Sequence, residues 1–150
     1  MRKLPGWLAI AALAALLAAC SSAPKEAPTE SPERDISLSG PVVETRWNLL
    51  LVGTNEQLSL PETPFFRISE DGRVSGHDGC NRFTARAELG DNQRIAISDI
   101  ATTRMACPES ESVERVTAML ENAYRYLIDH DRLVFFGPDS RVLGGWRQAD

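Results

Sequence analysis

Three cysteines and two histidines are the residues of this 150-residue chain whose types could do chemistry. A thiol can be acylated, form a disulfide or bind a metal ion, and an imidazole can transfer protons. Cys20 follows a segment that begins with Arg2 and Lys3 and continues with an apolar stretch from Leu8 to Leu17. This order is typical of a cleaved secretory signal, and the apolar run is shorter than the roughly 20 residues of a membrane-spanning helix. We therefore predict that residues 1–19 form a signal peptide.

The end of this signal, Leu17-Ala18-Ala19-Cys20, resembles the bacterial lipobox. The resemblance implies that the Cys20 thiol is acylated, that the chain is cut before it, and that the new amino group is acylated as well. Two or more acyl chains hold a protein durably on a bilayer. Ser21 follows the cysteine and, by the same resemblance, favours the outer membrane, with the domain facing the periplasm. An ordinary signal peptide cleaved near Ala19 is the alternative.

The net charge argues against one class of partner. Removal of residues 1–19 takes two of the 16 basic residues and none of the 21 acidic ones, which leaves 14 basic residues and a net charge of −7. Proteins that bind nucleic acid need a basic face that displaces counterions, so we expect no nucleic acid partner. The same sign argues against an additional electrostatic hold on anionic lipid. The ordinary interpretation of this charge is simple solubility.

Cys80 and Cys107 remain once Cys20 is acylated, and they then lie in a compartment where disulfides form and persist. We expect a bridge between them, which would stabilise the fold by about 3.6 kcal/mol through the loop that it closes. Two separate buried thiols are the alternative. A metal site is less favoured, because two cysteines without convergent histidines do not complete a tetrahedral ligand set.

The remaining candidates form no catalytic pattern. His77 has a serine and an aspartate nearby, but catalytic triads assemble from residues distant in sequence, and His130 lies in a charged turn. The acidic residues show no paired arrangement. Gly76-x-x-Gly79 lacks the Lys-Ser/Thr that follows in a phosphate-binding loop. We therefore expect a protein that is not an enzyme and that has no metal or cofactor.

A tether and one domain position these residues. Residues 20–41 are rich in Ser, Ala, Pro, Glu and Thr, which predicts a disordered tether behind the lipidated cysteine. Residues 42–150 contain segments with strand periodicity and one with helical spacing of apolar residues. The predicted strands are 43–51, 64–69, 73–75, 82–89, 94–100, 133–136 and 141–146, and the predicted helix is 109–127.

Hairpin-linked strands with a single helix favour an antiparallel sheet. The chain lacks the regular alternation of strands and helices that builds a parallel sheet. We predict an α+β fold, in which a small antiparallel β-sheet curls into a half-open barrel with one amphipathic helix.

Two segments carry a family resemblance, namely residues 74–83 (VSGHDGCNRF) and 102–107 (TTRMAC). Together with Trp47, Leu49 and Glu114, they closely resemble the META domain family, which includes HslJ-like bacterial lipoproteins. The resemblance extends over about residues 43–146. The residues of the family motif are Gly76, Gly79, Asn81, Arg82, Phe83, Thr103, Arg104, Met105 and Glu114.

We interpret this motif first as structure. The two glycines permit tight backbone conformations before a strand, and Asn81 can satisfy local backbone groups. Glu114 is a candidate ion-pair or hydrogen-bond partner of Arg82 or Arg104. The alternative interpretation is an arginine-lined patch that binds an anionic group.

The resemblance implies an envelope lipoprotein with a structural or interaction role in stress, linked with heat induction and tolerance of novobiocin-type antibiotics. A second hypothesis is a carrier similar to pilotin lipoproteins, with an acyl chain or apolar peptide in a barrel lined by Trp47, Phe66, Phe83 and Phe135. A carrier requires an apolar cavity of about 300 Å³ or more, whereas a scaffold has a filled interior. The expected partners are a lipid bilayer, through acylated Cys20, and an unknown envelope protein or apolar ligand.

Overall fold

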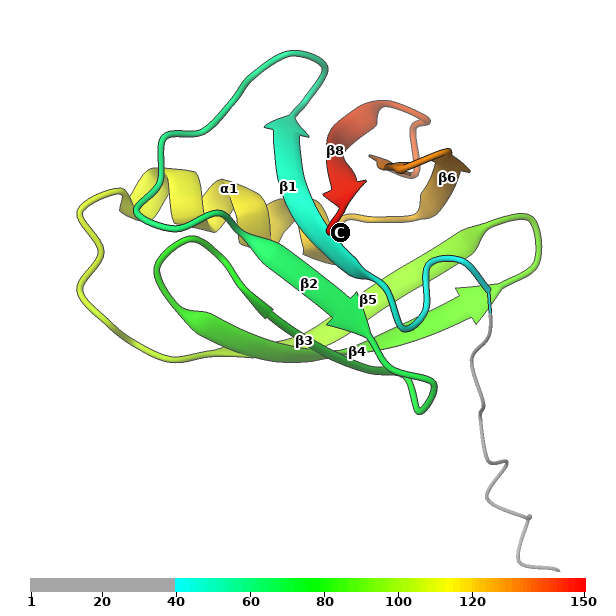
Figure 1. The fold of residues 1–150 in the computed structure, drawn as a ribbon, viewed down its shortest axis with the longest axis horizontal. Helices are drawn as coiled ribbons and strands as arrows, with labels where there is room; N and C mark the ends of the chain where they lie inside the picture. Colours follow the sequence, from blue (N-terminus) through cyan, green and yellow to red (C-terminus); the bar gives the residue numbers. More distant parts are fainter. Residues whose placement is uncertain (1–39) are drawn as a thin grey trace, which may run out of the picture. The chain divides into compact units, whose positions relative to one another are not determined.

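The computed structural model describes residues 40–150, in which eight antiparallel strands form a ring with one helix (Figure 1). The predicted signal peptide 1–19, Cys20 and residues 20–39 of the predicted tether lie outside the described residues. Within residues 40–150, no helix has the length and apolar character to cross a membrane. The elements are β1 (Arg46–Val52), β2 (Phe65–Ile68), β3 (Arg73–His77), β4 (Arg82–Gly90), β5 (Arg94–Thr102), α1 (Ser110–Glu121), β6 (Arg125–Asp129), β7 (Arg132–Phe136) and β8 (Val142–Gln148).

Each strand pairs with the next one along the chain, and the ring closes where β8 pairs with β1. In this closing pair, Leu49 lies opposite Trp146. The junction between β5 and β6 has the fewest paired residues, because these two strands share only the Arg94–Arg125 pair. The sheet is therefore a ring in which one junction has far fewer paired residues than the others. The curled antiparallel sheet and the single helix confirm the predicted α+β fold.

The alternation of side chains decides which face of each strand is buried. In β4, the buried residues Phe83, Ala85 and Ala87 alternate with exposed polar and charged ones. The same pattern holds in β3 and in the first half of β5. Apolar side chains of the first five strands therefore meet inside the ring, and their polar side chains form its outer surface.

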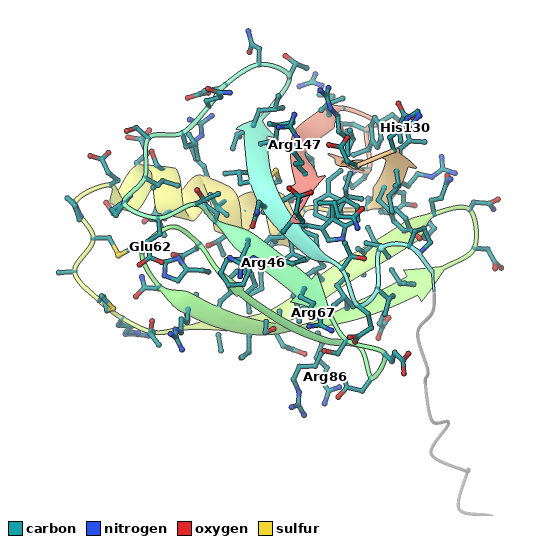
Figure 2. The ribbon with its side chains drawn as sticks, in the orientation of Figure 1. Arg46, Glu62, Arg67, Arg86, His130 and Arg147 are labelled. Carbon is teal, nitrogen blue, oxygen red and sulfur yellow. A yellow bond between two sulfur atoms is a disulfide. The ribbon has the colours of Figure 1, made fainter. Side chains whose placement is uncertain are left out.

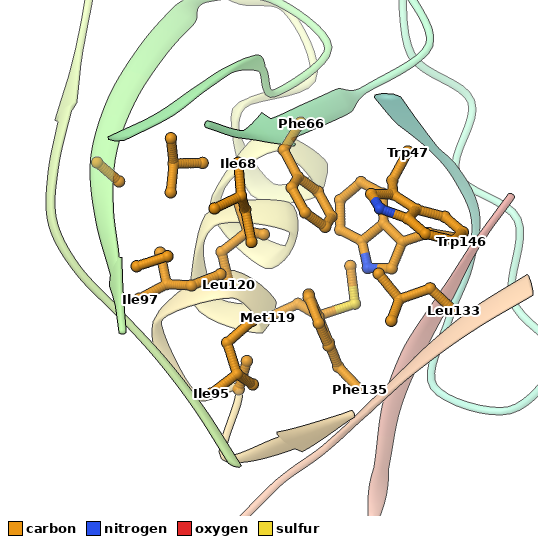
Figure 3. Close-up of a cluster of buried hydrophobic side chains, with 14 of the residues drawn as sticks. Trp47, Phe66, Ile68, Ile95, Ile97, Met119, Leu120, Leu133, Phe135 and Trp146 are labelled. Carbon is orange, nitrogen blue, oxygen red and sulfur yellow. The ribbon is translucent and has the colours of Figure 1, made fainter. Parts of the chain in front are cut away.

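Aromatic side chains fill the centre of the ring (Figure 3). The ring centroid of Phe66 lies 4.8 Å from that of Trp146 and 5.7 Å from that of Phe135. Trp47 belongs to the same buried cluster. Edge-to-face and offset arrangements at such separations add to the free energy that apolar burial provides. The interior is thus occupied by the side chains of the protein itself.

Helix α1 supplies another part of this core and contacts β5 and β1. Figure 3 shows Met119 and Leu120 of the helix among the side chains of the cluster. Towards solvent, the Arg115 guanidinium donates hydrogen bonds of 2.7 and 2.6 Å to the two carboxylate oxygens of Glu56. These bonds lower the pKa of Glu56 and connect the helix to the segment after β1.

The predicted helix 109–127 is wrong at its C-terminal end, because α1 ends at Glu121. The side-chain amide and the backbone N–H of Asn122 both donate to the Ala118 carbonyl, at 2.7 and 3.0 Å, and so cap the helix. The following β6 pairs with β7 through all of its residues. Apolar spacing up to Leu127 fits a helix as well as a strand, and the pairing with β7 decides for the strand. Leu127 consequently faces solvent instead of the core.

The two core tryptophans differ in one interaction, which predicts different costs for the same substitution. The Nε1–H of Trp47 donates to the buried Val42 carbonyl at 3.2 Å, whereas the buried Nε1–H of Trp146 has no acceptor among the described residues. Trp47→Phe should lower the free energy of unfolding by about 1–2 kcal/mol more than Trp146→Phe, because only Trp47→Phe leaves a buried carbonyl without its partner. Urea denaturation of the two variants measures this difference. Equal costs, or the reverse order, would contradict the prediction.

Candidate functional site

The two motif segments meet at one corner of the ring, which we call the disulfide corner (residues 76–83 and 102–107). The β3–β4 hairpin supplies the first segment, and the chain from the end of β5 towards α1 supplies the second. Cys80 and Cys107 form a disulfide with their Cα atoms 6.0 Å apart, as predicted. The Thr103 N–H donates to the Arg82 carbonyl at 3.0 Å, so backbone pairing extends beyond β5 towards the bridge.

Asn81 connects the two segments through its buried side-chain amide. Its Oδ1 accepts hydrogen bonds from the Thr103 hydroxyl at 3.0 Å and from the Met105 N–H at 2.8 Å. Its Nδ2 donates to the Cys107 Sγ at 3.3 Å. Asn81 therefore satisfies a backbone group, but one on the second segment rather than a local one. The buried amide and the disulfide hold the same two pieces of chain together.

Asp78 fixes the turn that presents Asn81, and it is only 2% exposed. Its Oδ1 accepts hydrogen bonds from the backbone N–H groups of Cys80 at 3.0 Å and of Asn81 at 2.6 Å. An aspartate that accepts from the backbone two residues later forms an Asx turn, for which Asp followed by Gly is a typical sequence. The Asp78-Gly79 pair was the signal that could have revealed this role from the sequence.

The backbone requires both motif glycines. Gly79 has a φ of 105°, a conformation that residues with a side chain rarely adopt. Gly76 lies opposite Phe83 on the neighbouring strand, and a Cβ atom at this position would overlap the Phe83 ring and the Phe65 carbonyl oxygen. These two glycines, together with buried Phe83, therefore act in the packing of the corner.

His77 takes part in the same corner through both ring nitrogens. Its Nδ1 accepts the Gly79 N–H at 3.1 Å, and its Nε2 lies 3.3 Å from a carboxylate oxygen of Glu62. The His77 ring also stacks on that of Phe65, with the centroids 6.4 Å apart. Because Nδ1 is an acceptor, the hydrogen of the neutral imidazole belongs on Nε2, facing Glu62. These contacts position the histidine as a structural residue of the turn.

The second histidine, His130, lies far from the motif in sequence and occupies the exposed β6–β7 turn. Its Nδ1 lies 2.7 Å from a carboxylate oxygen of the adjacent Asp129. Within the range that the structure describes, no group of three or more His, Cys, Asp or Glu side chains is arranged to hold a metal ion.

The predicted ion pair of Glu114 with Arg82 or Arg104 is absent from residues 40–150. Glu114 lies on α1 at a cavity of about 400 Å³ between the helix and β5, where the lining also includes Asp78 and Asn81. Arg82 belongs to the exposed face of β4, and Arg104 is exposed in the chain that follows β5. Proximity to the bridge in sequence did not determine where these side chains point.

An open groove of about 840 Å³ borders the disulfide corner along β2, β3 and β4. Apolar side chains, hydroxyl groups, one guanidinium and one carboxylate line it, among them Glu62, Phe65, Ser75, Arg82, Thr84 and Met105. Met105 is 64% exposed, more than any other large apolar side chain of the described residues. The groove is therefore where the motif presents apolar surface to the outside, with one cationic and one anionic side chain at its lining.

Among residues 40–150, the side chains inside the ring form a packed core where the carrier hypothesis predicted a cavity. Trp47, Phe66 and Phe135 were expected to line that cavity, but all three belong to the packed core. Phe83, the fourth predicted lining residue, borders the outer groove as well as the core.

Comparison with known proteins relates this geometry to a family. The family model of the META domain matches residues 40–150, which is about three quarters of the chain. The chain belongs to the META domain family. No curated protein matches this META domain protein.

Solved structures share the fold of this META domain. One structure determined by NMR is 23% identical, with a TM-score of 0.58, and the match covers 75% of this chain and 97% of that one. An NMR structure of a protein from Burkholderia xenovorans is 18% identical, with a TM-score of 0.57, and covers 72% and 83%. A crystal structure of a DUF4847 family protein from Bacteroides vulgatus is 12% identical, with a TM-score of 0.54, and covers 73% and 97%. At these identities, the likenesses show the fold alone.

The hydrogen bonds of Asn81 predict a large cost for its truncation. Asn81→Ala should lower the free energy of unfolding by about 2–3 kcal/mol, because the partly buried Met105 N–H and the Thr103 hydroxyl of the second segment lose their acceptor. Asn48→Ala is the matched control, since Asn48 makes only an exposed hydrogen bond from the Arg46 Nε at 3.2 Å, and it should change stability by about 0.5 kcal/mol or less. Chemical denaturation of both variants provides the measurement. A similar cost for the two substitutions would show that Asn81 does not connect the segments.

Proposed function

We propose that this META domain protein is a non-enzymatic lipoprotein of the bacterial envelope, anchored in the outer membrane through acylated Cys20. Its domain takes a structural or interaction role in envelope stress or in tolerance of novobiocin-type antibiotics. The observation that carries the proposal is that residues of the family motif make the structural contacts of the disulfide corner. Its asparagine, glycines and bridged cysteine hold the disulfide corner together. The motif leaves an open groove on the outside as the surface for a partner.

Two further features support an envelope location. The Cys80–Cys107 disulfide is the kind of bond that persists in an oxidising compartment. The N-terminal sequence up to Cys20 has the order of charged, apolar and small residues that a lipoprotein signal requires. Both features are independent of what the domain contacts.

A carrier function is a second candidate, and the outer groove is what favours it. Its volume of about 840 Å³ lies within the range of small-ligand sites, and Phe65, Phe83 and Met105 give it apolar lining. An acyl chain or an apolar peptide would occupy this groove rather than the filled ring interior. Native mass spectrometry of protein extracted from its own envelope distinguishes the two functions. A bound lipid or peptide would support the carrier, and a bare acylated monomer would support the scaffold.

Metabolic labelling tests the anchor. In cells grown on radiolabelled palmitate, the wild-type protein should carry the label and sediment with the membranes, because two or more acyl chains bind durably to a bilayer. Cys20→Ser should carry no label. Cys80→Ser is the control, since it removes a cysteine of the disulfide and should keep the label. A wild-type protein without label would contradict the proposed lipoprotein.

Complementation tests the proposed role and its surface together. A deletion strain should become more sensitive to novobiocin, and the wild-type gene should restore growth. Met105→Asp should fail to restore it, because a carboxylate would then occupy the apolar part of the groove. Leu127→Asp is the matched control, because Leu127 is the other exposed large apolar residue of the described range and lies on β6. Equal growth with the two variants, at equal protein levels, would exclude the groove as the functional surface.

A further inference from the structure

Five exposed arginines gather on the outer side of β1–β4, and we call this surface the arginine face. They are Arg46, Arg67, Arg73, Arg82 and Arg86. Arg46 lies opposite Arg67 and Arg73 lies opposite Arg86 in the register of the strands. Figure 2 shows Arg46, Arg67 and Arg86 following one another on this side of the ring. Like charges directly opposite one another destabilise a sheet, so the arrangement needs a counter-charge.

The chain itself supplies part of this counter-charge. Arg67 forms an ion pair with Glu44, just before β1. The Arg73 guanidinium lies 3.9 Å from the Asp71 carboxylate in the β2–β3 turn, and both side chains are largely exposed. Exposed pairs of this kind contribute little to stability.

The other three arginines of the face have no carboxylate partner within residues 40–150. The Arg46 guanidinium lies 3.6 Å above the centre of the Phe65 ring. Arg82 and Arg86 project from β4, where Glu88 is the only acidic residue of the strand. Two other arginine pairs face each other across strands: Arg147 of the Arg132–Arg147 pair lies 3.4 Å from Asp131, and Arg94 of the Arg94–Arg125 pair lies over the Tyr124 ring.

We propose that the arginine face docks on the surface of an anionic lipid bilayer. Guanidinium groups match phosphate oxygens in shape and charge, and can bind them with two parallel hydrogen bonds. The groove lies on the same side of the ring, through Phe65 of β2 and Arg82 of β4. Its exposed Met105 adds an apolar side chain that can enter the boundary between headgroups and acyl chains.

The path of the chain favours a bilayer over an acidic protein. Val43 bridges Ile68 at the end of β2, and Glu44 pairs with Arg67, so the chain enters the ring at the margin of the arginine face. About 20 residues separate Cys20 from Gly40, and a chain of that length reaches no more than roughly 70 Å. This step rests on the proposed function, because it takes the anchor at Cys20 as given.

The face also changes what the net charge implies. The net charge of −7 that remains after removal of residues 1–19 argued against an electrostatic hold on anionic lipid. The strand register, however, brings basic side chains to one side, and a bilayer interacts with the side that it meets. A weak contact suffices here, because an anchor raises the effective concentration of the domain at the surface.

Vesicle binding tests the face separately from the anchor. The mature chain carrying Cys20→Ser, which cannot be acylated, is sedimented with vesicles of phosphatidylglycerol and phosphatidylethanolamine and with vesicles of phosphatidylcholine. We expect partitioning to the anionic vesicles that weakens as salt is raised. Arg82→Gln with Arg86→Gln should lower the partition coefficient about 25-fold, from about fivefold per arginine. Arg132→Gln with Arg147→Gln removes the same charge from β7 and β8 and should lower it less than twofold.

Three outcomes would overturn the proposal. They are equal partitioning to both kinds of vesicle, equal losses for the two double variants, and a stronger arginine-dependent binding to polyglutamate than to anionic vesicles, which would indicate an acidic protein partner. Thermal melting of the variants guards against misfolding: Arg82→Gln with Arg86→Gln should not lower the melting temperature, because neither arginine has a carboxylate partner within residues 40–150. Failure of palmitate labelling would overturn the anchor and leave the vesicle result standing. Failure of vesicle binding would leave the anchor standing.

Discussion

The packing of Trp47, Phe66, Phe135 and Trp146 inside the ring is the constraint on which the rest of this META domain depends. β1 and β8 come from opposite ends of the domain, and they pair at the closing edge while their tryptophans share one interior. Apolar burial of this kind is the main favourable contribution to folding. Because the protein fills its own interior, a partner has to be met on the outer surface. The groove and the arginine face are two parts of that surface.

Local chemistry predicted most of the strands. The alternation from Arg82 to Leu89 and the turn at 90–92 marked β4 and the start of β5, and the structure has both. The helix was predicted to extend through Leu127, because the spacing of the apolar residues up to this position fits the period of a helix as well as that of a strand. Closure of the ring and the weak junction at Arg94–Arg125 depend on pairings between distant segments, which no local pattern contains.

The parts of the candidate site that could be predicted are those that depend on covalent bonding or on backbone conformation. The disulfide followed from the compartment, and the glycines followed from backbone geometry. The roles of Asp78 and Asn81 were partly open to prediction, because an Asp-Gly pair indicates an Asx turn while the partners of Asn81 lie more than 20 residues away. The ion pair of Glu114 was predicted wrongly, since side-chain direction depends on strand register and helix position. Register also decides that arginines of different strands share one face, so their grouping could not be found from the sequence.

The single residue pair between β5 and β6 determines where the ring is most easily separated. Every other neighbour relation in the ring joins strands through several residue pairs, so a separation at this junction breaks the fewest backbone contacts. It would leave a five-stranded sheet on one side and a three-stranded sheet on the other, still joined where β8 meets β1. The disulfide fastens the chain just after β5, so the covalent path between the two parts is shortened to the residues from Cys107 to β6. A separation of the ring would therefore break the fewest strand pairs at this junction, and the disulfide would keep the chain that leads to α1 attached to the β3–β4 hairpin.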